Sequence, residues 1–281
     1  MLWTEKLIVN VRIRRETKMR ELLDYLKKEL GNFVSKVRVE NVRIGLAYTA
    51  VVLSTRHAGV AYTPTTRLPE CPVLVDAGKI SGKSALNVMN KGESSNLVET
   101  AVGVATINAL SQAAFEAKPE KYVFSDIDVL DLIQPKDKVV MVGYFGPLIN
   151  KILRKTRDLY VLEKRKIKDK RVHFIFQHDA STVLPSSDIL LISGSTLVNK
   201  TINQILKLQG NAREVVLLGP TASMVPQPLF KKGVTAVMGV KITDAKKMLR
   251  VVSESGGTQQ LLSTCAKKTA FVRKVIEWKS S

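Results

Sequence analysis

The sequence predicts an α/β fold that is built on a parallel sheet in the second half of the chain. Three short apolar segments there run directly into glycine turns: VVMVGYFG at 139–146, ILLISGST at 189–196 and VVLLGPTA at 215–222. Continuous β-branched runs are typical of parallel strands that are buried on both faces. The turns deliver backbone N–H groups to one edge of the sheet, where open α/β sheets bind ligands. They predict where a site lies, but they do not name its chemistry.

Length and composition indicate two globular domains. The chain has 281 residues, of which 45% are hydrophobic and 25% are charged. A single core rarely grows to this size, so we expect domains at 1–119 and 120–281, divided at Lys118-Pro119-Glu120.

The first domain reads as an α+β unit. Apolar residues at helical spacing predict a helix at 17–30, and alternation followed by an apolar run predicts a strand pair or meander at 36–54. GVAYTPT at 59–65 adds a strand. A short helix at 83–89 and a helix rich in small residues at 94–116 follow.

Beyond residue 120, strands and helices alternate, which implies βαβ units and a Rossmann-like domain. We expect strands at 139–143, 159–163, 171–176, 188–193, 214–218 and 234–238. We expect helices at 147–156, 197–208 and 243–254.

Charge and cysteine content restrict the function classes. The net charge is +19, which suits an anionic partner, but the cations are scattered without an aromatic-punctuated motif and argue against specific nucleic-acid binding. Cys71 and Cys265 form neither a disulfide framework nor a CxxC metal site. Neither a membrane span nor a signal-peptide pattern is present, so we expect a cytoplasmic protein. A homo-oligomer is compatible with the sequence.

The turn after the first of these strands stands where a dinucleotide fold binds phosphate. Glu163 ends the next strand 20 residues after Gly143, at the spacing of an acid that binds ribose. The full GxGxxG pattern is absent, because Tyr144 and Phe145 occupy the turn. This favours a tight turn whose side chains line a cleft, and a nucleotide or methyl-donor site is the alternative.

The other two turns carry polar and stiff residues. Ser195, Thr196 and Asn199 stand at a helix start, where hydroxyl and N–H groups suit an oxyanion or phosphate, although N-capping alone also explains them. Prolines, beginning with Pro220, stiffen the loop at 219–233 and favour a role in shaping a pocket.

Two carboxylates are the candidate metal ligands. Glu99 stands among apolar residues of the helix at 94–116, so it needs a cation, another partner or a raised pKa unless it faces solvent. Asp179 follows His178 after a strand and is placed to orient a ligand. The sequence has no HxH, HExxH or CxxC spacing, so it gives only weak support to a preformed site for a divalent metal ion.

Five segments, taken in order between about residues 40 and 257, resemble the putative heavy-metal chelation domain family. They are ETAVGVATINAL, VVMVGYFGPL, YVLEK, LPSSDILLISGSTLVNKT and GPTASMVPQPLFKKGV. The resemblance implies an N-terminal domain like that of enolase, a Rossmann-like C-terminal domain and a site in the cleft between them. It implies ligand-binding roles for Thr55, Asn108, Tyr144, Phe145, Glu163, Thr196, Asn199, Pro220 and Thr221, and metal-side roles for Glu99 and Asp179.

The leading hypothesis is an interdomain cleft that binds a small anionic molecule or its metal complex, with a role in heavy-metal chelation or chelator metabolism. In this reading Glu99 and Asp179 are metal-side or acid–base carboxylates. The alternative is a Rossmann-type transferase or lyase that acts on a nucleotide-like or methyl-donor substrate. A nucleic-acid-associated protein is a third hypothesis. The sequence leaves open whether the protein catalyses any reaction.

Overall fold

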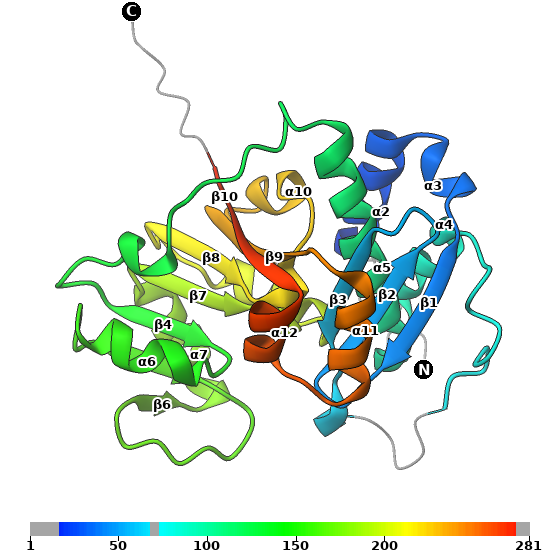
Figure 1. Cartoon of the computed structure of the whole chain (residues 1–281). Coiled ribbons are helices and arrows are strands. Elements are labelled where there is room, and N and C mark those ends of the chain that lie inside the picture. Colours follow the sequence, from blue (N-terminus) through cyan, green and yellow to red (C-terminus); the bar gives the residue numbers. More distant parts are fainter. Residues whose placement is uncertain (1–16, 68–72, 274–281) are drawn as a thin grey trace, which may run out of the picture.

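The computed structural model describes residues 17–67 and 73–273, which form a small antiparallel sheet and a larger mixed sheet (Figure 1). The α/β class predicted from the sequence is confirmed. The likenesses to Rossmann and enolase N-terminal domains stay predictions. Cys71 lies outside the described residues.

The chain enters the described part through an amphipathic helix. Helix α2 (Thr17–Leu30) has the predicted bounds, and it buries Leu23 and Leu26. Gly31 follows with φ +53°, the left-handed conformation that commonly ends a helix. The short helix α3 (Phe33–Lys36) then leads into the small sheet.

The small sheet has three antiparallel strands in the order β1-β2-β3: β1 (Val39–Ile44), β2 (Tyr48–Leu53) and β3 (Ala58–Tyr62). Alternate side chains of β2 and β3 pack on helix α5 (Leu97–Ala117) and on helix α11 (Ala245–Ser253). At Gly59 a Cβ would lie 2.3 Å from the carbonyl oxygen of Ala105, so only glycine lets α5 approach so closely.

The connection from β3 to α5 contains little regular secondary structure. It contains η1 (Thr65–Arg67), α4 (Ala85–Met89) and η2 (Asn90–Glu93). The side-chain oxygen of Asn96 accepts hydrogen bonds from the N–H groups of Val98 and Glu99 and so caps α5. Helix α5 is buried along most of its length, as its small and apolar residues allow.

The larger sheet has the strand order β10-β9-β8-β7-β4-β5-β6, in which all neighbours are parallel except β9 and β10. The chain goes from β4 outward to β5 and β6, then returns to place β7 on the other side of β4. This reversal makes a switch point between β4 and β7. The strands are β4 (Val139–Val142), β5 (Leu159–Leu162), β6 (His173–Ile175), β7 (Ile189–Ser193), β8 (Glu214–Leu218), β9 (Ala236–Ile242) and β10 (Ala266–Val272).

Helices and 3₁₀ turns connect these strands. In chain order they are η3 (Val129–Leu132), α6 (Gly146–Leu153), η4 (Gln177–Asp179), α7 (Ala180–Val183), η5 (Leu184–Ser186), α8 (Ser195–Val198), α9 (Ile202–Lys207), η6 (Pro220–Ala222), α10 (Gln227–Phe230), α11 and α12 (Thr258–Thr264).

The region of the larger sheet differs from the sequence prediction in several places. The helix expected at 197–208 is broken into α8 and α9, because Lys200 between them adopts a left-handed conformation with φ +58°. The short helices α7 and α10, helix α12 and the antiparallel strand β10 were not predicted. Two exposed lysines in β10 weaken the apolar pattern that marks the other strands.

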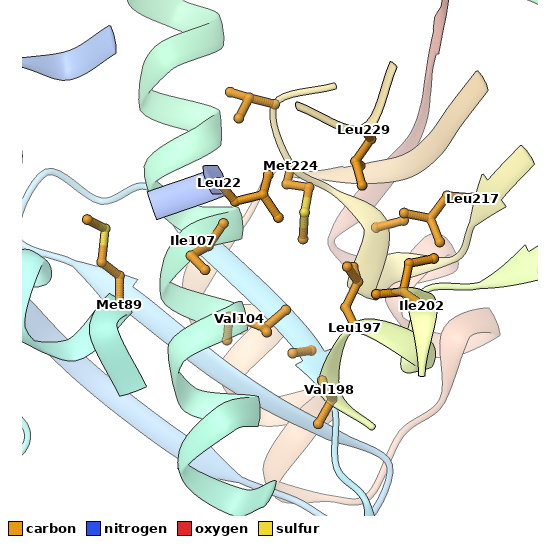
Figure 2. Packing of buried hydrophobic residues seen from close by; sticks show 14 of the residues in the cluster. Leu22, Met89, Val104, Ile107, Leu197, Val198, Ile202, Leu217, Met224 and Leu229 are labelled. Atoms are coloured by element: carbon orange, nitrogen blue, oxygen red, sulfur yellow. The ribbon is translucent and has the colours of Figure 1, made fainter. Parts of the chain in front are cut away.

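One hydrophobic cluster joins the two sheets. Leu22 and Ile107 from the first part of the chain belong to the same buried cluster as Leu197 and Met224 from the second part (Figure 2). The domain division at residues 119 and 120 therefore stays a prediction. In the described ranges no helix combines the length and hydropathy that a membrane span requires.

Candidate functional site

A cavity of about 600 Å³ lies at the carboxyl ends of β4, β7 and β8, between the two sheets. We call it the edge pocket. It lies at the switch point of the strand order, where α/β sheets commonly bind ligands. Its size is within the range of small-molecule sites.

The turn after β4 brings two aromatic side chains into the edge pocket. Gly143 has φ +96°, and a Cβ there would lie 2.8 Å from the Cβ of Ser193 in β7. Glycine thus allows the two strand ends to meet. Tyr144 and Phe145, which follow it, both line the pocket, and their ligand-binding roles stay predictions.

The turn after β7 adds hydroxyl groups. Ser193, Gly194 and Ser195 line the pocket, and Ser195 Oγ donates to Ser193 Oγ at 2.9 Å. Thr196 is buried outside the pocket lining and donates to the carbonyl oxygen of Ser193 at 2.7 Å. Thr196 supports the turn, whereas Ser193 and Ser195 are placed to reach a ligand.

The turn after β8 connects the pocket to the small sheet. Pro220 and Thr221 line the pocket, and Thr221 Oγ1 accepts from the N–H of Tyr62 at 2.9 Å. The side-chain amide of Asn108, on α5, donates to the carbonyl oxygens of Val60 at 2.8 Å and Thr221 at 3.0 Å. Asn108 is fully buried, so it fixes the wall from behind and does not line the pocket.

The remaining walls were not predicted. Tyr48 and Tyr62, paired across β2 and β3, line the pocket with residues from α12 and β10. The hydroxyl groups of Tyr48 and Thr258 are hydrogen-bonded at 2.7 Å, and burial raises the pKa of Tyr48. The alternation of β2 and β3 offered a weak signal for the two tyrosines, but no local pattern places α12 beside them.

Charged side chains also border the edge pocket. Lys268 Nζ lies 3.4 Å from a carboxylate oxygen of Asp128, which forms one ion pair. Lys151 and Asp126 also line the pocket and form no ion pair within the described part of the chain. These two exposed charges are therefore available to a ligand.

Glu163 lies beside the pocket wall and is fully engaged. Its carboxylate accepts from the N–H of Tyr144 at 3.1 Å, and from the N–H and guanidinium of Arg165 at 3.0 Å and 2.8 Å. Burial opposes its ionisation, but these bonds to Arg165 hold the pKa of Glu163 below its ordinary value. To bind a ribose, Glu163 would have to give up bonds to Arg165 or Tyr144.

A second carboxylate holds the ring of Tyr144. The Tyr144 hydroxyl donates to Asp169 at 2.9 Å, and this bond raises the pKa of Tyr144. The guanidinium group of Arg171 donates two hydrogen bonds to the same carboxylate, at 2.8 Å and 2.6 Å, and its backbone N–H donates a third at 3.0 Å. The loop between β5 and β6 therefore sets the orientation of one pocket wall.

Glu99 is paired with a cation, which is one of the alternatives that the sequence left open. Its carboxylate accepts from Lys91 Nζ at 2.7 Å and from Ser94 Oγ at 2.5 Å. These bonds hold the pKa of Glu99 below its ordinary value. Lys91 also lies 3.0 Å from Asp76, so Glu99 belongs to a chain of ion pairs at the start of α5 and does not line the edge pocket.

Three other predicted residues lie outside the edge pocket. Thr55, in the turn between β2 and β3, is hydrogen-bonded to His57 at 2.8 Å, at the opposite end of the hairpin from Tyr62. Asp179 is partly exposed in η4, and its carboxylate lies 3.3 Å from His178 Nε2. Asn199 lines a different cavity. Across residues 17–67 and 73–273, no group of three or more His, Cys, Asp or Glu side chains is arranged to hold a metal ion.

Two family models match the chain, and both carry the description "Putative heavy-metal chelation". DUF364 matches residues 126–271, more than half of the chain, and DUF4213 matches residues 23–111. An uncharacterized protein of Methanocaldococcus jannaschii is 33% identical over 174 residues, 59% of this chain and 64% of the relative. The match thus spans slightly less than two thirds of that relative's length.

Two solved structures share the fold. A protein of unknown function from Pyrococcus horikoshii is 27% identical with a TM-score of 0.75, over 90% of this chain and 100% of that chain. A second, from Desulfitobacterium hafniense, is 20% identical with a TM-score of 0.73, over 90% and 99% of the respective chains. Both are described as members of the DUF364 family.

Proposed function

Because the chain belongs to the putative heavy-metal chelation family, as its motifs predicted, we propose that the edge pocket binds a small organic chelator or the metal complex of one. The observation that carries the proposal is the chemistry of the pocket lining. It is mostly apolar and aromatic, with neutral hydroxyl groups and a few charges, and it supports recognition of an organic molecule.

The lining holds two lysines and two aspartates, and of these Lys151 and Asp126 form no ion pair within the described residues. The proposal of an anionic chelator therefore rests on Lys151 and not on the overall charge of the pocket. Chelators of heavy metals commonly bear carboxylate groups, and the ammonium group of Lys151 has no ion pair within the described residues. The rings of Tyr62, Tyr144 and Phe145 suit a flat apolar part of the same ligand. The hydroxyl groups of Ser193 and Ser195 lie where they can bond to polar atoms of the ligand.

The metal in this proposal is cargo that arrives with its own ligands. The described residues hold no cluster of metal-ligating side chains, and Glu99 is bonded to Lys91 and Ser94. Direct metal binding by Glu99 or Asp179 stays a prediction, and it is the rival that an experiment must separate.

The nucleotide or methyl-donor alternative has less support. The position at the switch point would suit it, but bulky Tyr144 and Phe145 replace the glycines that let phosphate approach the backbone. The carboxylate of Glu163, which would bind the ribose hydroxyl groups, accepts hydrogen bonds from Arg165. The proposal is therefore one of binding, and it assigns no reaction.

Calorimetry on the untagged full chain can test the proposal with three probes: Ni²⁺ alone, pyridine-2,6-dicarboxylate alone, and the nickel complex of this flat anionic chelator. We expect the chelator or its complex to bind. Phe145→Ala and Lys151→Gln should each weaken that binding about tenfold, because each removes one contact of the pocket. Phe176→Ala is the matched control, since Phe176 is 70% exposed and lies outside the pocket.

Two results would contradict binding of a chelator in the edge pocket. One-to-one binding of bare Ni²⁺ that is lost in Glu99→Gln or Asp179→Asn, with no binding of the chelator, would replace the proposal by direct metal coordination. Equal effects of Phe145→Ala and Phe176→Ala would also contradict it, because the contact would then not be in the edge pocket.

A further inference from the structure

A second cavity, of about 760 Å³, shares no lining residue with the edge pocket. It lies where α2, η2, the loop between α8 and α9, and α10 meet. Five apolar side chains of the lining belong to the hydrophobic cluster that joins the two sheets: Leu22, Leu197, Ile202, Leu206 and Leu229. All of these except Leu206 are labelled in Figure 2. We call it the basic pocket, after the four cations that line it: Arg20, Lys200, Lys207 and Lys232.

The cations of the basic pocket outnumber the acids that face them. Glu93 is the one acidic residue among the described lining residues. Lys232 is paired with Glu21, whereas Arg20 and Lys207 form no ion pair with any described residue. The cavity therefore has a positive charge that the protein does not balance locally, which attracts an anion.

Lys200 is held in place by neutral groups. Its ammonium group donates to the backbone carbonyl oxygens of Glu93, at 2.9 Å, and of Ser94. No carboxylate among the described residues lies within ion-pair distance of it, and loss of surrounding water lowers the pKa of Lys200. Its backbone is left-handed, a conformation that costs a lysine free energy. These features position a cation at the wall of the cavity without neutralising it.

Asn199, which precedes Lys200, has a side-chain acceptor to which no described group donates a hydrogen bond. Asn199 lines the same cavity, and its buried Oδ1 has no hydrogen-bond partner among the described residues. A buried acceptor of this kind costs free energy unless a donor reaches it. Because Oδ1 is shielded from solvent, a ligand hydroxyl group reaches it when the Asn199 side chain turns toward the cavity.

We propose that the basic pocket binds a phosphate monoester that bears hydroxyl groups, such as a sugar phosphate or a mononucleotide. The phosphate accepts hydrogen bonds from Lys200 and from Arg20 or Lys207, and charge-assisted bonds of this kind are strong. A ligand hydroxyl donates to Asn199 Oδ1, and the apolar lining packs against the rest of the molecule. This site is independent of the chelator proposal, because the two cavities have no residue in common.

The test is calorimetry on the full chain at low salt with inorganic phosphate, ribose 5-phosphate, adenosine monophosphate and neutral ribose. We expect ribose 5-phosphate to bind more tightly than inorganic phosphate, and ribose not to bind. Tighter binding of the nucleotide would identify a nucleotide as the source, and equal or weaker binding would identify a sugar phosphate. Absence of binding by both phosphate esters at millimolar concentration would overturn the proposal.

Charge variants then locate the binding. The double variant R20Q/K207Q removes two cations that make no ion pair in the described structure, and it should weaken ribose 5-phosphate binding at least tenfold. The matched control is K246Q/K267Q, which removes two exposed lysines outside both cavities. Equal losses in the two double variants would mean that only net charge matters, and would overturn the site.

A hydroxyl-specific variant separates the two halves of the proposal. Asn199→Leu removes the acceptor and keeps the branched shape and the number of heavy atoms of the side chain. Ribose 5-phosphate should then lose its advantage over inorganic phosphate, whose own affinity stays the same. An unchanged advantage would contradict the role of Asn199. R20Q/K207Q and N199L both leave Lys200 in place, so these tests do not disturb its left-handed backbone.

Discussion

The two cavities show two different uses of polar side chains in one core. In the edge pocket, Glu163 and Asp169 are bonded to arginines and serve to position the wall. The surface that faces a ligand is mostly apolar or neutral, and the cations and acids among its described residues are equal in number. In the basic pocket, Arg20 and Lys207 form no ion pair with described residues, so the lining itself is charged. The paired carboxylates thus hold the wall of the edge pocket in place, whereas the unpaired cations of the basic pocket are available to a ligand.

The largest effect is expected from a variant that disrupts the packing behind the basic pocket and leaves the edge pocket intact. A Cβ at Gly103 on α5 would lie 2.0 Å from the backbone nitrogen of Gly92, which lines this pocket. Gly103→Ala should therefore push η2 away and lower the free energy of unfolding by about 3 kcal/mol. Chemical denaturation measures the change.

The control for this prediction is Gly257→Ala, where the nearest atom to a new Cβ is Gln260 Oε1 at an ordinary 3.4 Å. Its stability should stay close to that of the parent chain. If the two pockets are separate, Gly103→Ala also leaves binding of the dicarboxylate probe unchanged. Loss of both ligands together would mean that the pockets are coupled.

A smaller effect is expected at the support of the edge pocket. Glu163→Gln weakens the bonds to Tyr144 and Arg165, and it should lower the free energy of unfolding at pH 7 by about 2 kcal/mol. Denaturation at a series of pH values adds a second readout. Since folding lowers the pKa of Glu163, its contribution is present at neutral pH and is lost as pH falls through the folded pKa.

The difference between the parent chain and Glu163→Gln should accordingly shrink below about pH 4. Glu254→Gln is the comparison variant, because Glu254 is exposed and forms no ion pair within the described ranges. A difference for Glu163→Gln that is the same at pH 7 and pH 3 would show that the carboxylate charge plays no part in supporting the wall.

The smallest effect concerns a single phenol. Asp169→Asn removes the carboxylate that accepts from the Tyr144 hydroxyl, so the pKa of Tyr144 should fall toward its ordinary value. Ultraviolet titration of the phenolate, with Tyr144→Phe to assign the signal, measures this shift. An unchanged Tyr144 titration would mean that the bond to Asp169 does not persist in solution.

Local pattern was sufficient for much of the fold. The helix predicted at 17–30 has the same bounds as α2, because its apolar face and terminal glycine are signals within the segment itself. The strand predicted at 214–218 coincides with β8 for the same kind of reason. The break between α8 and α9 was missed, since left-handed Lys200 is held by contacts with Glu93 and Ser94, far away in the sequence.

The candidate site was predicted less completely. Tyr144, Phe145, Pro220 and Thr221 follow strands whose ends meet, so the glycine turns placed them in the edge pocket. The argument about Glu99 identified the need for a partner, and Lys91 fills it, but no sequence signal told a structural cation from a metal. Lys151 and the walls from α12 and β10 depend on tertiary contacts that no local spacing reveals.

The strand order also has a consequence for how the protein folds. Tyr48 and Ala270 lie near opposite ends of the described chain, yet both line the edge pocket. Contacts between residues so distant in sequence require large loops to close and are slow to form. A nascent or partly refolded chain should therefore acquire its helices well before it acquires affinity for a ligand at this pocket, and recovery of binding would time the completion of folding.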